Sequence, residues 1–428
     1  MTRHIPFGLQ AAAFGLAALL AAPSSTPASP SFHGFLDARA GVRTGSDDHE
    51  KDVSLAEVRA QILAEQSAGD LLATVRADFL YDGVPPDFDL DLESGEGPVD
   101  LREANLQLPV GGLADIKAGR QILTWGVGDM LFINDLFPKD WQSFFSGRDT
   151  DYLKAPSDAI LIALYPSEWN MDVVYTPRFD ADRFVSGDRL SYWNPQLGRT
   201  AGKDAVIDPQ ERNSWFRDDE WAGRLRRTFS GYEAAAYGYA GFWKTPEAMD
   251  AGSGQAYYPE LSVFGASVRG PLGSGLVSLE AGYYDSREDR DGDDPLVPNS
   301  QPRGLIGYER ELARDLQLGL QYYAEVMMEY DAYRDSLPAG MGARDEVRQV
   351  ATVRMTRMAM NQNLTLSLFL YYSPTDKDAY LRPYAAYKMS DSLMLALGAN
   401  VFMGEDDDTF FGQFEDNNNV YAAIRYSF

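Results

Sequence analysis

Residues 420–428, VYAAIRYSF, end the printed chain and alternate in polarity from one position to the next. In an extended strand, the first face carries Val420, Ala422, Ile424, Tyr426 and Phe428, and the second carries Tyr421, Ala423, Arg425 and Ser427. Successive side chains of a β-strand point to opposite faces. The segment therefore predicts a strand with one apolar face and one more polar face.

The same alternation recurs along most of the chain. Within residues 56–62, Val58 and Ile62 alternate with Glu57 and Arg59, and residues 73–79 repeat the pattern. Further apolar rows occupy residues 264–268, 277–283, 318–326, 364–370 and 393–401. Segments of this length match the roughly 9–11 residues with which a tilted strand crosses a bilayer.

The lengths of the connections favour a membrane barrel over a soluble sandwich. Short links fall at 66–70, 110–113, 166–168, 230–231, 271–274 and 390–392, and long ones at 82–98, 126–156, 178–220, 244–259, 286–302 and 404–418. Bacterial outer-membrane barrels have short periplasmic turns and long extracellular loops.

We therefore predict an all-β fold, a single transmembrane antiparallel β-barrel of eighteen strands. Sixteen strands stay open, because residues 159–165 and 303–311 alternate poorly. The terminal Phe428 resembles the signal by which outer-membrane barrels are recognised for assembly. The alternative is a secreted all-β sandwich.

The first 28 residues form a predicted signal peptide. Arg3 and His4 precede the apolar run 7–22, which is too short to span a bilayer, and a Pro-rich stretch follows. We expect cleavage after Ala22 or Ala28, and a barrel domain over residues 29–428 in the bacterial outer membrane.

Composition excludes several classes of function. The net charge of −26 argues against nucleic-acid binding, and the chain has no cysteine and only three histidines, His4, His33 and His49. Neither His33 nor His49 has a motif-bearing partner, so we expect no enzyme, no catalytic residue and no resident cofactor. The alternative function is a barrel sheath around an export or cytochrome electron-transfer partner, although this chain cannot itself ligate several haems.

A hairpin in residues 101–126 carries a family resemblance. It contains the residues LREA (Leu101 to Ala104), GRQ (Gly119 to Gln121) and WG (Trp125 and Gly126) around a short turn. In this order it resembles the hairpin of outer-membrane porins related to alginate export. The resemblance implies a channel-forming porin and leaves its solute open.

The polar strand faces carry nearly balanced charge. Ten basic residues, Arg39, Arg59, Arg76, Arg224, Arg226, Arg348, Arg354, Arg382, Lys388 and Arg425, stand against Asp37, Glu57, Asp78, Glu103, Asp172, Glu233, Glu280 and Glu325. As candidate selectivity residues we select Arg224, Arg226, Arg348, Arg354 and Arg382, because guanidinium groups suit carboxylate or phosphate. The alternative is that they only neutralise acids on neighbouring strands.

The excess acid lies in the loops, for example in residues 82–100 and 405–416, which contain no Lys or Arg. Such carboxylates either bind divalent cations that bridge outer-membrane lipid and lipopolysaccharide, or concentrate cations at the mouth. Asp289, Asp291 and Asp293 form an incomplete Ca²⁺ candidate, because the later Glu of a full calcium loop is missing.

The connection 126–156 differs from the other loops. It mixes large apolar residues, such as Phe132, Phe137, Phe144 and Phe145, with charges. A fully solvated loop would not expose so many apolar groups. We expect this segment to fold into the barrel and pack on its wall, and the alternative is an outer lid packed on neighbouring loops.

Four residues of this segment would then line a constriction: Arg148, Asp149, Asp151 and Lys154. Such a constriction, together with nearly equal numbers of basic and acidic residues facing the lumen, predicts an outer-membrane porin for passive passage of small polar or anionic solutes. The solute, the ion selectivity and the oligomeric state stay open.

Overall fold

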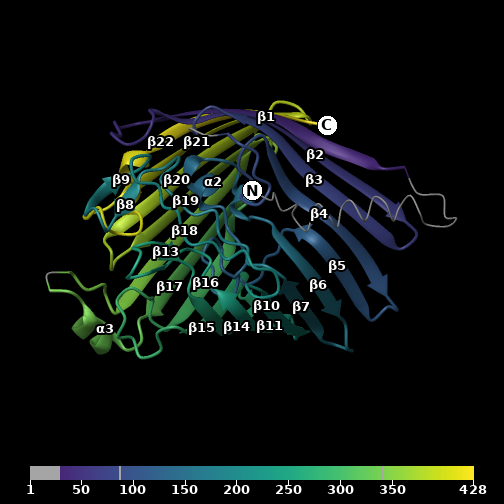
Figure 1. Ribbon diagram of the computed structural model, residues 1–428. Coiled ribbons are helices and arrows are strands. Elements are labelled where there is room, and N and C mark those ends of the chain that lie inside the picture. The colour runs from purple at the N-terminus through teal and green to yellow at the C-terminus, as the bar shows by residue number, and fades with distance from the viewer. Residues whose placement is uncertain (1–28, 86–87, 340) are drawn as a thin grey trace.

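The computed structural model describes residues 29–85, 88–339 and 341–428, so the predicted signal peptide lies outside the described residues. Eighteen antiparallel strands form one sheet, and pairing of its first strand with its last closes it into a barrel (Figure 1). The strands are β1 (Ser31–Arg43), β2 (Val53–Ala68), β3 (Leu71–Asp82), β4 (Val99–Val110), β5 (Ala114–Gln121), β6 (Ser157–Leu164), β7 (Asn170–Thr176), β10 (Glu220–Phe229), β11 (Tyr232–Phe242), β14 (Glu260–Leu272), β15 (Gly275–Ser286), β16 (Gln301–Ala313), β17 (Leu316–Val326), β18 (Val347–Ala359), β19 (Leu364–Ser373), β20 (Asp378–Lys388), β21 (Leu393–Met403) and β22 (Asn419–Ser427). The prediction of eighteen strands is confirmed.

The two segments that alternate poorly are nevertheless strands. They form β6 and β16, each paired on both sides. Their pattern is weak because inward positions of this barrel also carry apolar residues, such as Leu305, which is buried. Alternation in polarity fails where both faces of the wall meet apolar surroundings.

The period-two pattern places the apolar side chains on the outer wall. Phe264 and Leu397 point outward and are each 64% exposed, whereas inward Tyr421 is buried. A belt of exposed apolar side chains therefore surrounds the barrel, and the charged and aromatic residues of the other face fill its interior. This arrangement inverts that of a soluble domain.

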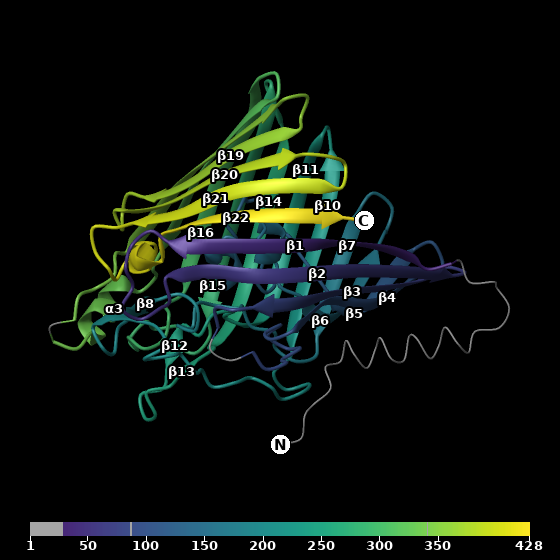
Figure 2. The ribbon, with the colours of Figure 1, turned by 90° about the horizontal axis from the view of Figure 1, so that it is seen from above.

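Short turns and long loops lie on opposite rims. The turn between β4 and β5 has three residues, and its first two, Gly111 and Gly112, adopt positive φ, a backbone that glycine takes at little cost. The long loops contain small elements of secondary structure. Two are hairpins, β8 (Tyr192–Asn194) with β9 (Arg199–Ala201) and β12 (Ala248–Met249) with β13 (Ala256–Tyr257), and two are short helices, α3 (Tyr330–Ser336) and the 3₁₀-helix η2 (Gly412–Asn417). Figure 2 shows β1 and β22 side by side, with the C-terminus on the rim of the short turns. Among the described residues, no helix has the length and apolarity needed to cross a membrane.

Candidate functional site

The segment between β5 and β6, residues 122–156, crosses the interior of the barrel. It contains the helix α2 (Trp141–Ser146) and the 3₁₀-helix η1 (Thr150–Leu153). It leaves the wall after Gln121 and returns at Ser157, which are paired neighbours in the sheet. Between these points it contacts inward side chains of β2, β3, β15 and β18 to β22. We refer to residues 122–156 as the inward segment.

Glu280 on β15 anchors the first part of the inward segment. Its buried carboxylate accepts hydrogen bonds from the backbone N–H groups of Val127 and Gly128 at 2.8 and 3.1 Å. It also accepts from the backbone and side-chain nitrogens of Asn134, both at 2.9 Å. Four donors on one buried carboxylate fix this turn against the wall.

An aromatic cluster anchors the middle of the segment. Phe144 and Phe145 of α2 pack edge-on against Tyr380 of β20, with ring centroids 5.8 and 5.5 Å apart, and Phe145 also packs on Phe402 of β21. All four rings are buried. The side chain of Asp140 caps α2 by accepting from the Ser143 backbone N–H. The apolar residues of this segment therefore form a core inside the barrel.

Ion pairs anchor the last part of the segment. Arg148 Nε donates to Glu57 Oε2 at 2.7 Å, and its Nη2 donates to Asp82 Oδ2 at 3.0 Å. Both carboxylates are buried on β2 and β3. Burial lowers the pKa of Arg148, but the negative charges of Glu57, Asp82 and Asp140 together outweigh this effect, and the net shift is upward. The guanidinium thus stays charged in this site.

Tyr152 fixes the neighbouring turn. Its hydroxyl donates to Asp78 on β3, and the guanidinium groups of Arg59 and Arg102 lie 4.2 and 4.8 Å from its ring centroid. Arg102 also donates to the backbone oxygen of Lys154 at 2.6 Å. The arginine of the LREA hairpin therefore holds the inward segment in place.

The loop between β7 and β10 braces the segment from the long-loop rim. Asp182 accepts from the Lys139 backbone N–H and from Trp141 Nε1, at 2.8 and 2.9 Å. Arg183 pairs with Asp100 on β4 and with Asp140, the cap of α2. Burial raises the pKa of Asp182.

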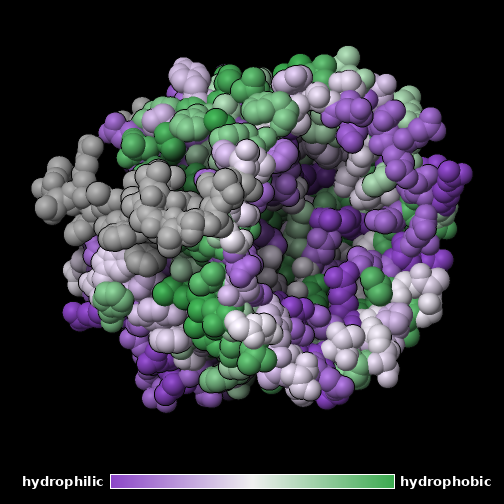
Figure 3. Space-filling model, turned by 90° about the vertical axis from the view of Figure 1, so that its right-hand side faces the viewer, coloured by the Kyte–Doolittle hydropathy of each residue, from purple (hydrophilic) through white to green (hydrophobic). Residues whose placement is uncertain are grey.

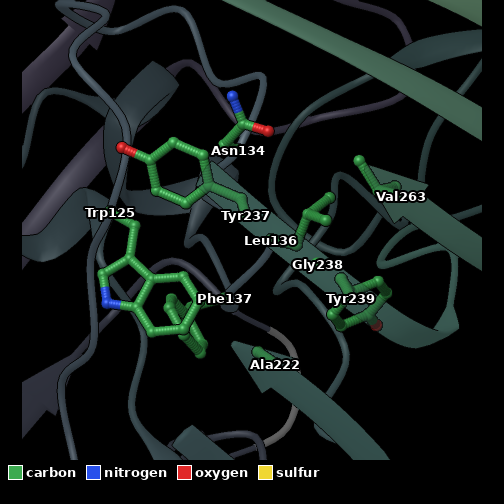
Figure 4. A pocket seen from close by; sticks show the side chains of 9 residues that line it. All are labelled: Trp125, Asn134, Leu136, Phe137, Ala222, Tyr237, Gly238, Tyr239 and Val263. Atoms are coloured by element: carbon green, nitrogen blue, oxygen red, sulfur yellow. The ribbon is translucent and has the colours of Figure 1, made fainter. Parts of the chain in front are cut away.

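The segment packs closely against the facing wall. A cavity of about 10 Å³ lies between it and β10, β11 and β14 (Figure 4), with Trp125, Asn134 and Tyr237 among its lining residues. Trp125 packs edge-on against Phe137, with centroids 4.9 Å apart. Such a space holds at most about one water molecule, so little free volume is left between the segment and the wall at this point.

The predicted constriction residues fall into two groups. Arg148 turns into the wall, as described above. Asp149 keeps 26% of its side chain exposed while pairing with Arg425 at 3.0 Å, and Asp151 is exposed. Lys154 is half-buried, donates to Thr124, and has its pKa lowered by burial. The structure thus leaves Asp149, Asp151 and Lys154 in contact with solvent.

The five predicted selectivity arginines all point inward, and each has a protein partner. Arg224 pairs with Asp172, its register neighbour, at 2.6 Å. The other partners are Glu233 for Arg226, Glu325 and Asp376 for Arg348, Asp129 for Arg354, and the backbone oxygen of Arg148 for Arg382. Four of these side chains therefore neutralise acids of a neighbouring strand, an adjoining loop or the inward segment, and Arg382 donates to a backbone oxygen. Arg226 and Arg354 remain about one-third exposed.

The predicted Ca²⁺ candidate does not assemble. Asp289 is buried, and its carboxylate accepts from the backbone N–H groups of Gly292, Asp293 and Asp294. Its lone pairs are thus used to shape its own turn. Across the part of the chain that the structure describes, no three His or carboxylate side chains, Asp289, Asp291 and Asp293 included, come together to hold a metal ion. Cation binding by the acidic loops stays a prediction.

Sequence reasoning missed the anchors on the facing wall. Glu280 was read only as one lumen charge among several, and Tyr380 and Phe402 were not singled out. One signal in the sequence was Gly126: it has φ +79, and a Cβ there would lie 2.8 Å from Glu280 Oε1.

On the short-turn side, the molecule is hollowed between the strands and bordered largely by hydrophilic residues (Figure 3).

Comparison with known proteins identifies the fold. No family model matches this chain, and no curated protein matches it. Among solved structures, Acinetobacter baumannii OccAB4 is similar with a TM-score of 0.56 and 9% identity, over 94% of this chain and 99% of that one. Acinetobacter baumannii OccAB3 gives 0.55 and 10% over 94% and 99%, and Pseudomonas aeruginosa OccD3 (OpdP) gives 0.54 and 12% over 94% and 91%.

These proteins are outer-membrane porins. The likeness shows that this chain has the porin barrel fold. The resemblance of its hairpin to alginate-export porins stays a prediction.

Proposed function

We propose that this protein is an outer-membrane channel through which small polar or anionic solutes pass passively, narrowed by the inward segment. The porin fold and the apolar outer belt support the location. The observation that carries the proposal is the inward segment itself, held from wall to wall by Glu280 and Arg148. A segment so placed limits the size of a passing solute. It also leaves little room for a protein partner in the lumen.

Charge would act together with size. Arg224 with Asp172, and Arg354 with Asp129, set opposite charges side by side along the lumen. Such pairs orient water and make entry of an apolar solute unfavourable. Exposed arginine edges can exchange a protein carboxylate for a solute carboxylate or phosphate, because both offer the same bidentate geometry.

A planar-bilayer recording tests the proposal. Folded protein without residues 1–28 would be reconstituted, and single-channel currents recorded under a salt gradient. Stable open steps with a defined reversal potential are expected. Electrical silence from protein that migrates as a folded barrel on unheated gels would contradict a passive channel.

Replacing Arg224 and Arg226 together by Ser should shift selectivity towards cations. The change leaves Asp172 and Glu233 without their partners on the lumen side, so the local potential becomes more negative. The reversal potential under a salt gradient measures this shift. Arg227→Ser is the matched control, because Arg227 lies on the same strand but pairs with Glu168 near the turn. An unchanged reversal potential in the double variant would remove these arginines from the pore path.

Acidification should make the channel more anion-selective through Asp129. Burial raises the pKa of Asp129 above its ordinary value of about 3.9, so its carboxylate takes up a proton at a higher pH than solvated carboxylates do. Protonation frees the charge of Arg354, which lies 2.8 Å away. The ratio of anion to cation permeability should therefore rise as the pH falls towards about 4.

Asp129→Asn should show this raised ratio already at neutral pH and respond less to acid. Asp70→Asn is the control, since Asp70 lies exposed in the short turn between β2 and β3 and the change leaves the partner of Arg354 intact. Equal pH responses in wild type and Asp129→Asn would contradict the assignment.

A further inference from the structure

The outer wall has a concave apolar groove over β18 to β22 and β1 to β2. Its volume is about 1040 Å³. Figure 2 looks onto this part of the barrel, where β19 to β22, β1 and β2 run side by side. A barrel wall is convex on the outside, so a hollow of this size needs a local cause and offers room for a ligand.

Small side chains cause the hollow. One hydrogen-bonded row across seven strands joins Arg357, Leu366, Ala385, Leu397, Ala422, Ala40 and Ala56. Four of these seven outward positions are alanine. In the next row, Pro383 of β20 has no N–H to donate to a neighbouring strand, and the pairing with β21 is interrupted between Leu381 and Tyr384 while its register is kept. The alanines lower the floor of the groove beside larger side chains such as Met355 and Leu366.

A single charge borders this groove. Among the described residues that line it, Arg357 is the only charged one, and it is exposed. It follows Met355 on the outward face of β18, close to the short turn after Ala359. No ion pair of Arg357 occurs within the described residues. An arginine facing lipid is costly unless it reaches a polar partner at the interface.

We propose that this groove binds one glycerophospholipid of the periplasmic leaflet, with acyl chains on the alanine row and the phosphate on Arg357. This inference rests on the proposed outer-membrane location and on the short turns facing the periplasm. Flexible acyl chains can fill a concave apolar surface, and a phosphate matches the guanidinium fork. A second copy of the chain fits less well, because a concave patch is not complementary to itself.

Native mass spectrometry of the detergent-solubilised full barrel, titrated with palmitoyl-oleoyl phosphatidylglycerol, tests the proposal. Wild type should retain one lipid. Arg357→Gln should weaken retention about tenfold, as expected for loss of a charge-assisted hydrogen bond. Ala422→Trp should fill the groove and abolish retention.

Two matched controls should retain the lipid as wild type does. Arg310→Gln removes an exposed arginine near the same turn rim but outside the groove, and Ala281→Trp adds a bulky group to the exposed outer face of β15. Equal losses for Arg357→Gln and Arg310→Gln, lipid retention by Ala422→Trp, or a lipid-free dimer would each overturn the proposal. The measurement does not depend on conduction, so failure of the channel proposal would be seen separately in bilayer recordings.

Discussion

Deleting residues 124–154 and joining β5 to β6 by a short Gly-Ser turn should raise the single-channel conductance several-fold. Gln121 and Ser157 are paired neighbours, so a tight turn can close the gap without moving either strand. The deletion removes α2 with its aromatic core. It also removes the hydrogen bonds to Glu280 and the ion pair of Arg148 with Glu57, which hold the inward segment across the lumen. Conductance follows the narrowest cross-section of a pore, and under the proposed function the inward segment forms it.

Shortening the loop around α3 is the matched control for this deletion. That loop lies on the long-loop rim, away from the inward segment (Figure 1), and its removal should leave conductance unchanged. Both variants must migrate as folded barrels on unheated gels. Wild-type conductance in the deletion variant would show that another part of the lumen is limiting.

The sequence was sufficient for the wall of the barrel. Alternation as in Val420 to Phe428 is a local property, and most strands repeat it, so the two faces follow without knowledge of neighbours. The strand count also needed the lengths of the connections, and it left sixteen strands open. The weak alternation of β16 has a physical reason. Its inward Leu305 belongs to the apolar core inside the barrel, which a pattern of apolar-out and polar-in does not anticipate.

The interior was only partly predictable. The apolar composition of residues 126–156 indicated inward folding, because those side chains needed a surface to cover them. The sequence could not show which wall residues these side chains contact. Phe145 and Phe402, for example, lie far apart in the sequence and come into contact only in the closed barrel. Arg148 shows the same limit. Its charge was recognised, but whether it faces a solute or Glu57 depends on where the segment crosses.

Replacing Arg148 by Met should detach the last part of the inward segment. The change leaves the buried carboxylates of Glu57 and Asp82 with one cation fewer, and loss of one partner of a buried ion pair costs roughly 3–5 kcal/mol. Arg59 still pairs with Glu57, and Arg189 with Asp82, so the wall should stay folded while the segment loosens. Amide hydrogen exchange in residues 140–155 should accelerate, and recordings should show excursions to a higher conductance.

A double-mutant cycle separates the ion pair from a general loss of packing. If Glu57 destabilises the Met variant because its charge is buried with too few cations, then Glu57→Gln in the same chain should restore part of the amide protection. The coupling should reach about 0.5–3 kcal/mol, the range for contacting residues that share a network. Arg148→Lys keeps the charge but cannot bridge Glu57 and Asp82 as a fork, so its protection should fall between wild type and the Met variant. Additive effects in the cycle would instead assign the segment's position to its aromatic core, with Phe144 and Phe145 holding it against β20 and β21.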